Sequence, residues 1–89
     1  MWNVYIIKLA DGTYYKGLTN DLRRRIKQHK QGECYSTKNK LPCTLVHHEK
    51  CSTRREARSR EKFFKSGEGR ELIKQIENAR VAELADAQS

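Results

Sequence analysis

Residues 2–17 read WNVYIIKLADGTYYKG, an apolar run, a turn signal and a tyrosine-rich run, and this stretch decides the fold. The pattern predicts a β-hairpin. The apolar run does not alternate cleanly, which favours a strand covered on both faces and central in a small sheet. A two-residue turn would place the two tyrosines on opposite faces. A three-residue loop ending in a left-handed glycine places Tyr5 opposite Gly17, on the face of Tyr15. We predict the longer loop, because two tyrosines on one face can share a site.

A basic amphipathic helix follows the hairpin. We expect Thr19 or Asn20 as its N-cap and Gly32 at its end. Its inward stripe recurs at helical spacing and consists of Leu22, Ile26 and His29. Arg25 lies beside that stripe, so an arginine and a histidine are expected close to the sheet.

The second helix is expected to begin at Ser52 or Thr53, where residues 53–56 fit a capping box. One of its faces carries Ala57, Glu61 and Phe64. A carboxylate on a face that also holds alanine and phenylalanine is unusual. Glu61 is therefore a candidate functional residue.

The rest of the chain predicts a strand over residues 43–49 and a third helix around Leu72, Ile73 and Ile76. Gly67 and Gly69 are expected to break the chain between the two last helices. The predicted fold class is α/β (α+β): a small three-stranded antiparallel sheet flanked by helices, in the order β-β-α-β-α-α.

The chain of 89 residues is short enough for one domain, and its charge is uneven. Residues 1–76 hold 18 Lys and Arg against 8 Asp and Glu, a net charge of +10. Residues 77–89 hold one Arg and three acidic residues, and we expect a helical extension or a disordered tail there. A basic body attracts polyanions, so nucleic acid is the expected partner. A membrane is not expected, since no segment is apolar enough to insert and nothing resembles a signal peptide.

The three cysteines, Cys34, Cys43 and Cys51, are odd in number and form no C-x-x-C motif. With no secretory segment before them, reduced thiols are the natural interpretation. A cytoplasmic location is expected on that basis.

Each candidate residue also has an ordinary explanation. Tyr5 and Tyr15 fit aromatic positions of a strand that packs against a helix. Arg25 fits a solvated charge, His29 a hydrogen-bonded interior residue, and Glu61 a neutralising partner for the surrounding arginines. Taken singly, each residue favours the ordinary explanation; taken together, their order and spacing favour a site.

The order and spacing of these residues resemble the GIY-YIG nuclease superfamily, most closely its small stand-alone bacterial members. The pattern consists of Val4-Tyr5, Tyr15-Lys16-Gly17, Arg25, His29 and Glu61. The first motif reads Asn3-Val4-Tyr5 in place of Gly-Ile-Tyr, and the second has lysine in place of isoleucine, so both tyrosines and the final glycine are kept. The asparagine found later in some larger members has no assigned counterpart here.

The resemblance implies a metal-dependent endonuclease that hydrolyses DNA phosphodiester bonds, structure-directed and acting in DNA repair or recombination. The implied catalytic residues are Tyr5, Tyr15, Arg25, His29 and Glu61. Glu61 would hold one Mg²⁺ or Mn²⁺ ion. Tyr5 is the preferred activator of water, while Tyr15 and His29 stay open as alternatives, because a phenol with a pKa of about 10 is a poor base at neutral pH. Nearby Lys16, Arg25 and the metal would have to lower that pKa.

Basic residues around this site are expected to hold the nucleic-acid backbone without reading bases. They are Lys16, Arg23, Arg24, Lys27, Lys30, Lys38 and Lys40. RNA stays possible as the substrate, and a larger repair or restriction partner would supply targeting. The alternatives are a non-catalytic nucleic-acid-binding module of the same fold and a small protein whose basic face recruits an acidic partner.

Overall fold

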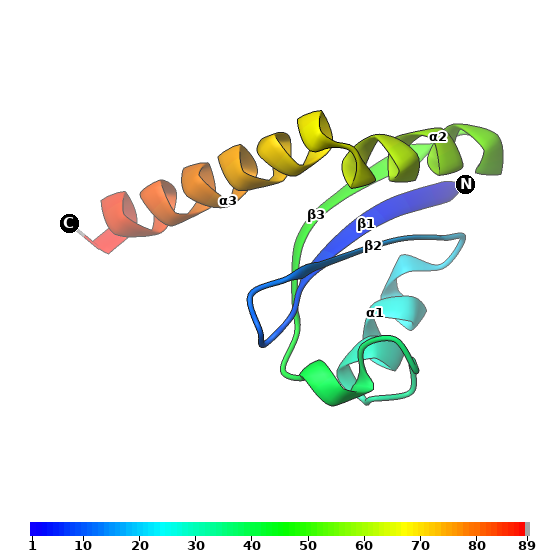
Figure 1. Cartoon of the computed structure of the whole chain (residues 1–89), viewed down its shortest axis with the longest axis horizontal. Helices are drawn as coiled ribbons and strands as arrows, with labels where there is room; N and C mark the ends of the chain where they lie inside the picture. The colour runs from blue at the N-terminus through cyan, green and yellow to red at the C-terminus, as the bar shows by residue number, and fades with distance from the viewer. Residues whose placement is uncertain (89) are drawn as a thin grey trace.

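The computed structural model describes the backbone of residues 1–88 and the side chains of residues 1–79. Seven elements follow one another along the chain (Figure 1): β1 (Trp2–Lys8), β2 (Tyr14–Thr19), α1 (Leu22–Lys30), the short 3₁₀ helix η1 (Lys38–Lys40), β3 (Thr44–Cys51), α2 (Arg54–Lys65) and α3 (Gly67–Gln88). Apart from η1, this is the predicted order β-β-α-β-α-α. The predicted α+β class is confirmed.

The three strands form one antiparallel sheet in the order β2-β1-β3, so β1 is central as expected. Tyr5 pairs with Gly17, and Ile7 pairs with Tyr15. The hairpin closes through a hydrogen bond of 2.8 Å from the Leu9 amide to the Thr13 carbonyl, and Gly12 between them has a φ of 86°. The three-residue loop is thereby confirmed, and it places Tyr5 and Tyr15 on one face.

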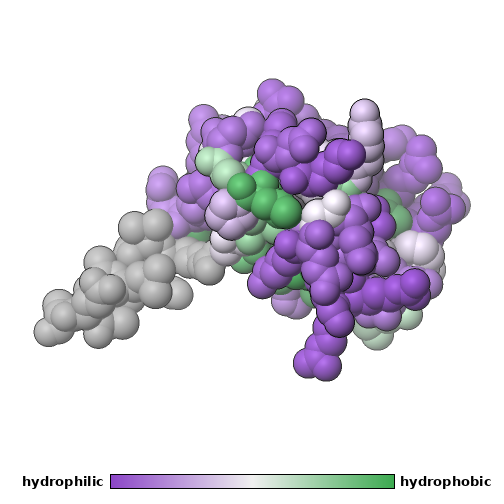
Figure 2. Space-filling model, turned by 90° about the horizontal axis from the view of Figure 1, so that it is seen from below, coloured by the Kyte–Doolittle hydropathy of each residue, from purple (hydrophilic) through white to green (hydrophobic). Residues whose placement is uncertain are grey.

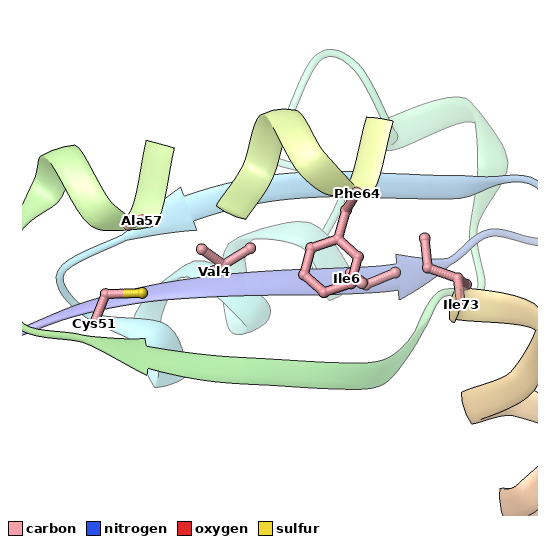
Figure 3. Close-up of a cluster of buried hydrophobic side chains, with 6 residues drawn as sticks. All are labelled: Val4, Ile6, Cys51, Ala57, Phe64 and Ile73. Carbon is pink, nitrogen blue, oxygen red and sulfur yellow. The ribbon is translucent and has the colours of Figure 1, made fainter. Parts of the chain in front are cut away.

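Both faces of β1 are buried, because its side chains alternate between two apolar clusters. On one face Val4 and Ile6 pack with residues of β3, α2 and α3. Figure 3 shows the ring of Phe64 reaching down from α2 onto Ile6. On the other face Tyr5 and Ile7 pack with a second set, to which α1 contributes Leu22 and Ile26. Helices α2 and α1 therefore cover opposite faces of the sheet (Figure 1).

The N-cap of α1 differs from the prediction. Asp21 is the capping residue, and its carboxylate accepts a hydrogen bond of 3.2 Å from the Arg24 amide. Thr19 lies two residues earlier, where its hydroxyl accepts from the Asp21 amide at 3.1 Å. Thr19, Asn20 and Asp21 are all residue types that can cap a helix. Asp21 is the N-cap because its side chain reaches the amide three residues further on. Gly32, with a φ of 76°, follows the helix end as expected.

Helix α2 begins after its N-cap, Thr53, whose hydroxyl accepts from the Glu56 amide at 3.2 Å. The Glu56 carboxylate in turn accepts from the amide of Ser52 at 3.1 Å, one residue before the cap. The predicted start of this helix is therefore confirmed.

Gly67 and Gly69 do not break the chain, contrary to expectation; they form the first turn of α3, and the break lies at Ser66. A Cβ atom on Gly69 would collide with the Phe63 carbonyl oxygen and the Phe64 Cα. Gly69 therefore allows α2 and α3 to pack closely. From the sequence it had been interpreted as a helix breaker.

Helix α3 continues without interruption to Gln88, so the tail at residues 77–88 extends a helix. Its far end runs away from the sheet (Figure 1). The ion pair between Lys8 and Glu77, 3.0 Å long, ties α3 to β1. The domain boundary between residues 76 and 77 stays a prediction. Among the described residues, no helix is both long and apolar enough to cross a membrane.

Replacing Gly69 by alanine is expected to destabilise the protein by about 1–3 kcal/mol, because overpacking outweighs the better helix propensity of alanine. Gly67→Ala is the matched control, since a Cβ there meets nothing within 4 Å. That variant should be neutral or more stable by up to about 1 kcal/mol. Urea unfolding of both variants measures the difference, and equal effects would show that the α2–α3 contact is not tight.

Candidate active site

Tyr5 is the centre of the candidate site. Its side chain is buried, with 1% of the residue exposed. The ring lies directly against the backbone of Gly17 on β2, because a Cβ atom placed on Gly17 would stand 2.5 Å from the Tyr5 Oη and 2.6 Å from its Cζ. Glycine at position 17 thus leaves the space in which the phenol lies.

A chain of hydrogen bonds leads away from the Tyr5 hydroxyl. The Arg25 Nε donates to the Tyr5 Oη at 3.3 Å, and His29 Nε2 lies 3.0 Å from the same oxygen. Because the guanidinium can only donate, the Tyr5 hydroxyl is free to give its own proton to His29 Nε2. In that arrangement the other ring nitrogen of His29, Nδ1, donates to Thr37 Oγ1 at 2.8 Å. Both His29 and Thr37 are buried.

Tyr15 lies beside this chain and is less buried than Tyr5. Its ring centroid is 6.2 Å from that of Tyr5 and 5.0 Å from that of His29. Four of the five predicted catalytic residues, Tyr5, Tyr15, Arg25 and His29, are therefore brought together from β1, β2 and α1. Their catalytic roles stay a prediction.

Burial sets the protonation of the cluster. It raises the pKa of Tyr5 to about 12, and the hydrogen bond from Arg25 lowers that pKa only in part. Burial, with the charge of Arg25, lowers the pKa of His29. At neutral pH the phenol keeps its proton and the imidazole is neutral. The prediction that Lys16 lowers the pKa of Tyr5 is wrong. Tyr14 and Leu18, two residues before and after Lys16, pack in the cluster on the other face of the sheet, so Lys16 faces away from Tyr5.

Glu61 is outside this hydrogen-bonded cluster. It lies on α2, the helix that covers the other face of the sheet, and its side chain is 20% exposed. Its Oε1 accepts from Lys65 at 3.4 Å. Within residues 1–79 no group of three or more His, Cys, Asp or Glu side chains converges on a metal position. A single carboxylate of partial exposure fits Mg²⁺ or Mn²⁺, which keep several waters and bind phosphate oxygens for the remaining positions.

Apart from Arg25 and His29, the basic side chains of α1 are exposed to solvent, as predicted. Those exposed on α1 and η1 are Arg23, Arg24, Lys27, Lys30, Lys38 and Lys40. The face that α1 and η1 form is predominantly hydrophilic (Figure 2). Lys40 pairs with Asp11 at 3.4 Å, so its charge is partly neutralised. The predicted contacts of these residues with nucleic acid stay untested.

A polar cavity of about 260 Å³ adjoins the cluster at the start of α1. Arg24 and Arg25 line it, together with Thr19, Asn20, Asp21 and Gln28. Arg25 therefore joins the buried tyrosine to a space large enough for a phosphate group. Two guanidinium groups in one polar cavity are suited to an anionic ligand.

Sequence reasoning missed Thr37 and Gln28. Thr37 holds His29 from a loop without periodicity, so no pattern marked it. Gln28 accepts from the Arg25 Nη1 at 3.3 Å and holds the guanidinium from the same helix. The three-residue spacing from Arg25 could have identified Gln28, because residues three apart on a helix are neighbours.

Fold and site together define a class of protein: a small α+β domain with a tyrosine–histidine–arginine cluster under one face of its sheet. The family model described as the GIY-YIG catalytic domain matches residues 1–74. The chain belongs to the GIY-YIG family, a family of nucleases.

The relatives are small UPF0213 proteins. One from Halobacterium salinarum is 42% identical over 62 residues, which cover 68% of this chain and 80% of the relative. Another from Bacillus pumilus is 37% identical over 82 residues, 91% of this chain and 84% of the relative. The solution NMR structure of a UPF0213 protein from Bacillus halodurans aligns with a TM-score of 0.54 and 32% identity, covering 85% of each chain.

Tyr5 is expected to ionise only near pH 12, because burial disfavours tyrosinate. The unfolded chain releases this proton near pH 10, so the contribution of Tyr5 to stability is fully present below about pH 10 and is lost as the pH rises towards 12. The difference in tyrosinate absorbance between wild type and Tyr5→Phe, titrated from neutral to high pH, measures the midpoint. A midpoint near 10 would mean that the phenol is solvated.

Gly17→Ala is expected to displace the Tyr5 ring and to destabilise the protein by about 1–3 kcal/mol. The cost should largely vanish when Tyr5→Ala removes the ring first, because the collision then has no partner. A double-mutant cycle of urea unfolding measures this coupling. The same cost in both backgrounds would place the strain elsewhere in β2.

Proposed function

We propose that the protein is a divalent-metal-dependent endonuclease that hydrolyses phosphodiester bonds of DNA. The observation that carries the proposal is the buried Tyr5–His29 hydrogen bond beside a cavity lined by Arg24 and Arg25. It puts a proton acceptor and an anion-binding group in one place. Hydrolysis of a phosphodiester needs both, because water is a poor nucleophile and the phosphate carries negative charge.

The Tyr5 hydroxyl is proposed to take a proton from the attacking water while it gives its own to His29. The hydrogen bond of 3.0 Å to Nε2 provides that outlet without forming a free tyrosinate, which the raised pKa disfavours. The Thr37 hydroxyl can accept a hydrogen bond from Nδ1, and in that tautomer Nε2 is the proton acceptor. Tyr15, the more exposed phenol, is proposed to orient the phosphate or to exchange roles with Tyr5.

Arg25 is proposed to stabilise the charge that develops on the phosphorus oxygens. It donates to Tyr5 and to Gln28, so its guanidinium is held in place before substrate arrives. Such preorganised donors are worth about 10²- to 10³-fold in rate. Arg24, in the same cavity, would bind the neighbouring phosphate oxygen.

Glu61 is the residue proposed to hold Mg²⁺ or Mn²⁺. When bound, the ion would polarise a phosphoryl oxygen and stabilise the departing oxygen. The exposed cations of α1 and η1 would bind flanking phosphates without reading bases, which suits a structure-directed role in DNA repair or recombination. A larger repair or restriction partner would direct such an enzyme to its substrate, and a cytoplasmic location stays a prediction from the three thiols.

Glu61→Gln is expected to reduce cleavage by at least about 10²-fold, because it removes the only proposed metal ligand while keeping the shape of the side chain. Cleavage of linear, nicked, flapped and four-way DNA is measured with Mg²⁺ or Mn²⁺. Glu71→Gln is the charge-matched control on the exposed surface of α3 and should cleave like wild type. A single-stranded RNA in the panel reports the other substrate class.

Binding of DNA by wild type with no cleavage, unchanged in Glu61→Gln, would contradict the proposal. It would favour the non-catalytic nucleic-acid-binding module. No affinity for any nucleic acid would instead favour the basic face as a docking surface for an acidic protein.

A further inference from the structure

A second cavity lies where β2 meets α3, on the side of the sheet that faces away from Tyr5 and Tyr15. Its volume is about 340 Å³. We call it the β2–α3 cleft, and it is lined by Thr13, Tyr14, Lys16, Arg70, Ile73 and Lys74. The cleft therefore combines three cations with the aromatic ring of Tyr14 and the apolar side chain of Ile73.

The charge of this cleft is not neutralised by the fold. Among the described residues, Lys16, Arg70 and Lys74 take part in no ion pair. In residues 1–79, the lysines and arginines that have a carboxylate partner are Lys8, Lys40, Arg60 and Lys65, and none of these four lines the cleft. Burial lowers the pKa of Lys16, and the nearby charges of Arg70 and Lys65 lower it further. An anion in the cleft would relieve this crowding of like charges.

The position of the cleft indicates which anion it takes. Lys16 directly follows Tyr15 on β2, and the two side chains point to opposite faces of an edge strand. A polymer that crosses the β2 edge can thus contact both residues. A polyanion with regularly spaced phosphates meets that requirement, whereas a single small anion fills only one side.

We propose that Lys16, Arg70 and Lys74 form a second binding site, which holds backbone phosphates of the DNA on the α3 side of β2. The inference rests on the proposed function, because the ligand is the same polynucleotide whose scissile bond would lie beside Tyr15 and Arg25. It adds Arg70 and Lys74, which sequence reasoning did not select, to the nucleic-acid contacts. In this arrangement the bound strand would cross the edge of the sheet at β2.

Salt dependence of binding tests the site without using activity. Binding of a labelled DNA oligonucleotide is followed by fluorescence anisotropy over a series of salt concentrations, with a chelator present to prevent cleavage. Two triple variants remove the same net charge. The test variant is Lys16→Gln, Arg70→Gln and Lys74→Gln, and the control, on β3 and α2, is Lys50→Gln, Arg55→Gln and Arg58→Gln.

The slope of log affinity against log salt is expected to fall in magnitude by about 1 for each phosphate that is no longer bound, so by about 3 in the test variant. The control should change this slope by less than about 1, since it alters the overall field but leaves every proposed phosphate-binding residue in place. Lys74→Glu alone, at an exposed position, should weaken binding without affecting thermal unfolding. It keeps the test valid if the triple variant folds poorly.

Equal slopes in the two triple variants would overturn the second site, and so would a wild type that does not bind DNA. The outcomes separate this inference from the proposed function. Wild-type cleavage together with equal slopes leaves the enzyme standing without this site. A slope lowered only in the test variant, with no cleavage by wild type, supports the site and removes the enzyme.

Discussion

The contact between the Tyr5 ring and the backbone of Gly17 is the constraint on which the site depends. It turns the phenol under the sheet and buries it, and a buried hydroxyl without a partner costs about 1–3 kcal/mol. The partners are His29 and Arg25, so α1 has to present both at the same depth. His29 in turn needs a partner for its second nitrogen, which fixes Thr37 and the loop that carries it. One aromatic side chain thereby couples the hairpin, the first helix and a loop without regular structure.

The central position of β1 divides the proposed chemistry between two faces of the sheet. Tyr5 and Tyr15 belong to the face covered by α1, while Glu61 belongs to the helix on the other face. The edge strand β2 is where the two faces meet, because consecutive residues of a strand point to opposite sides. A substrate that engages the phenols and the carboxylate together therefore has to cross the β2 edge. The sheet is small, with three strands in the part of the chain that the structure describes. One short stretch of nucleic-acid backbone can therefore reach both faces.

The hairpin and the inward stripe of α1 could be predicted from sequence because both are local. Loop length determines register, and register alone places Tyr5 and Tyr15 on one face. The predictions failed where tertiary contacts, and not the local sequence, determine the position of a residue. Gly69 looks like a breaker but is required by the Phe63 carbonyl, and Lys16 was assigned to the tyrosines although strand alternation turns it away. Thr37 could not be found at all, since its role comes from burial beside His29. No local pattern indicates which face each helix covers, so the separation of Glu61 from the tyrosines was not foreseen.

The carboxylate of Glu61 has two candidate cationic partners, and they compete. Lys65 is an i+4 neighbour on the same helix, 56% exposed, and such a pair stabilises a helix by only about 0.2–0.5 kcal/mol. A divalent ion bound through Glu61 would displace this ammonium group at little cost. The released Lys65 is already close enough to Lys16 to depress its pKa, so its charge would add to that of the β2–α3 cleft. Under the proposed roles of Glu61 and the cleft, occupation of the carboxylate and attraction of the phosphate backbone would therefore be linked through Lys65. Because such linkage is reciprocal, a polyanion that draws Lys65 into the cleft would equally free Glu61 for a metal ion.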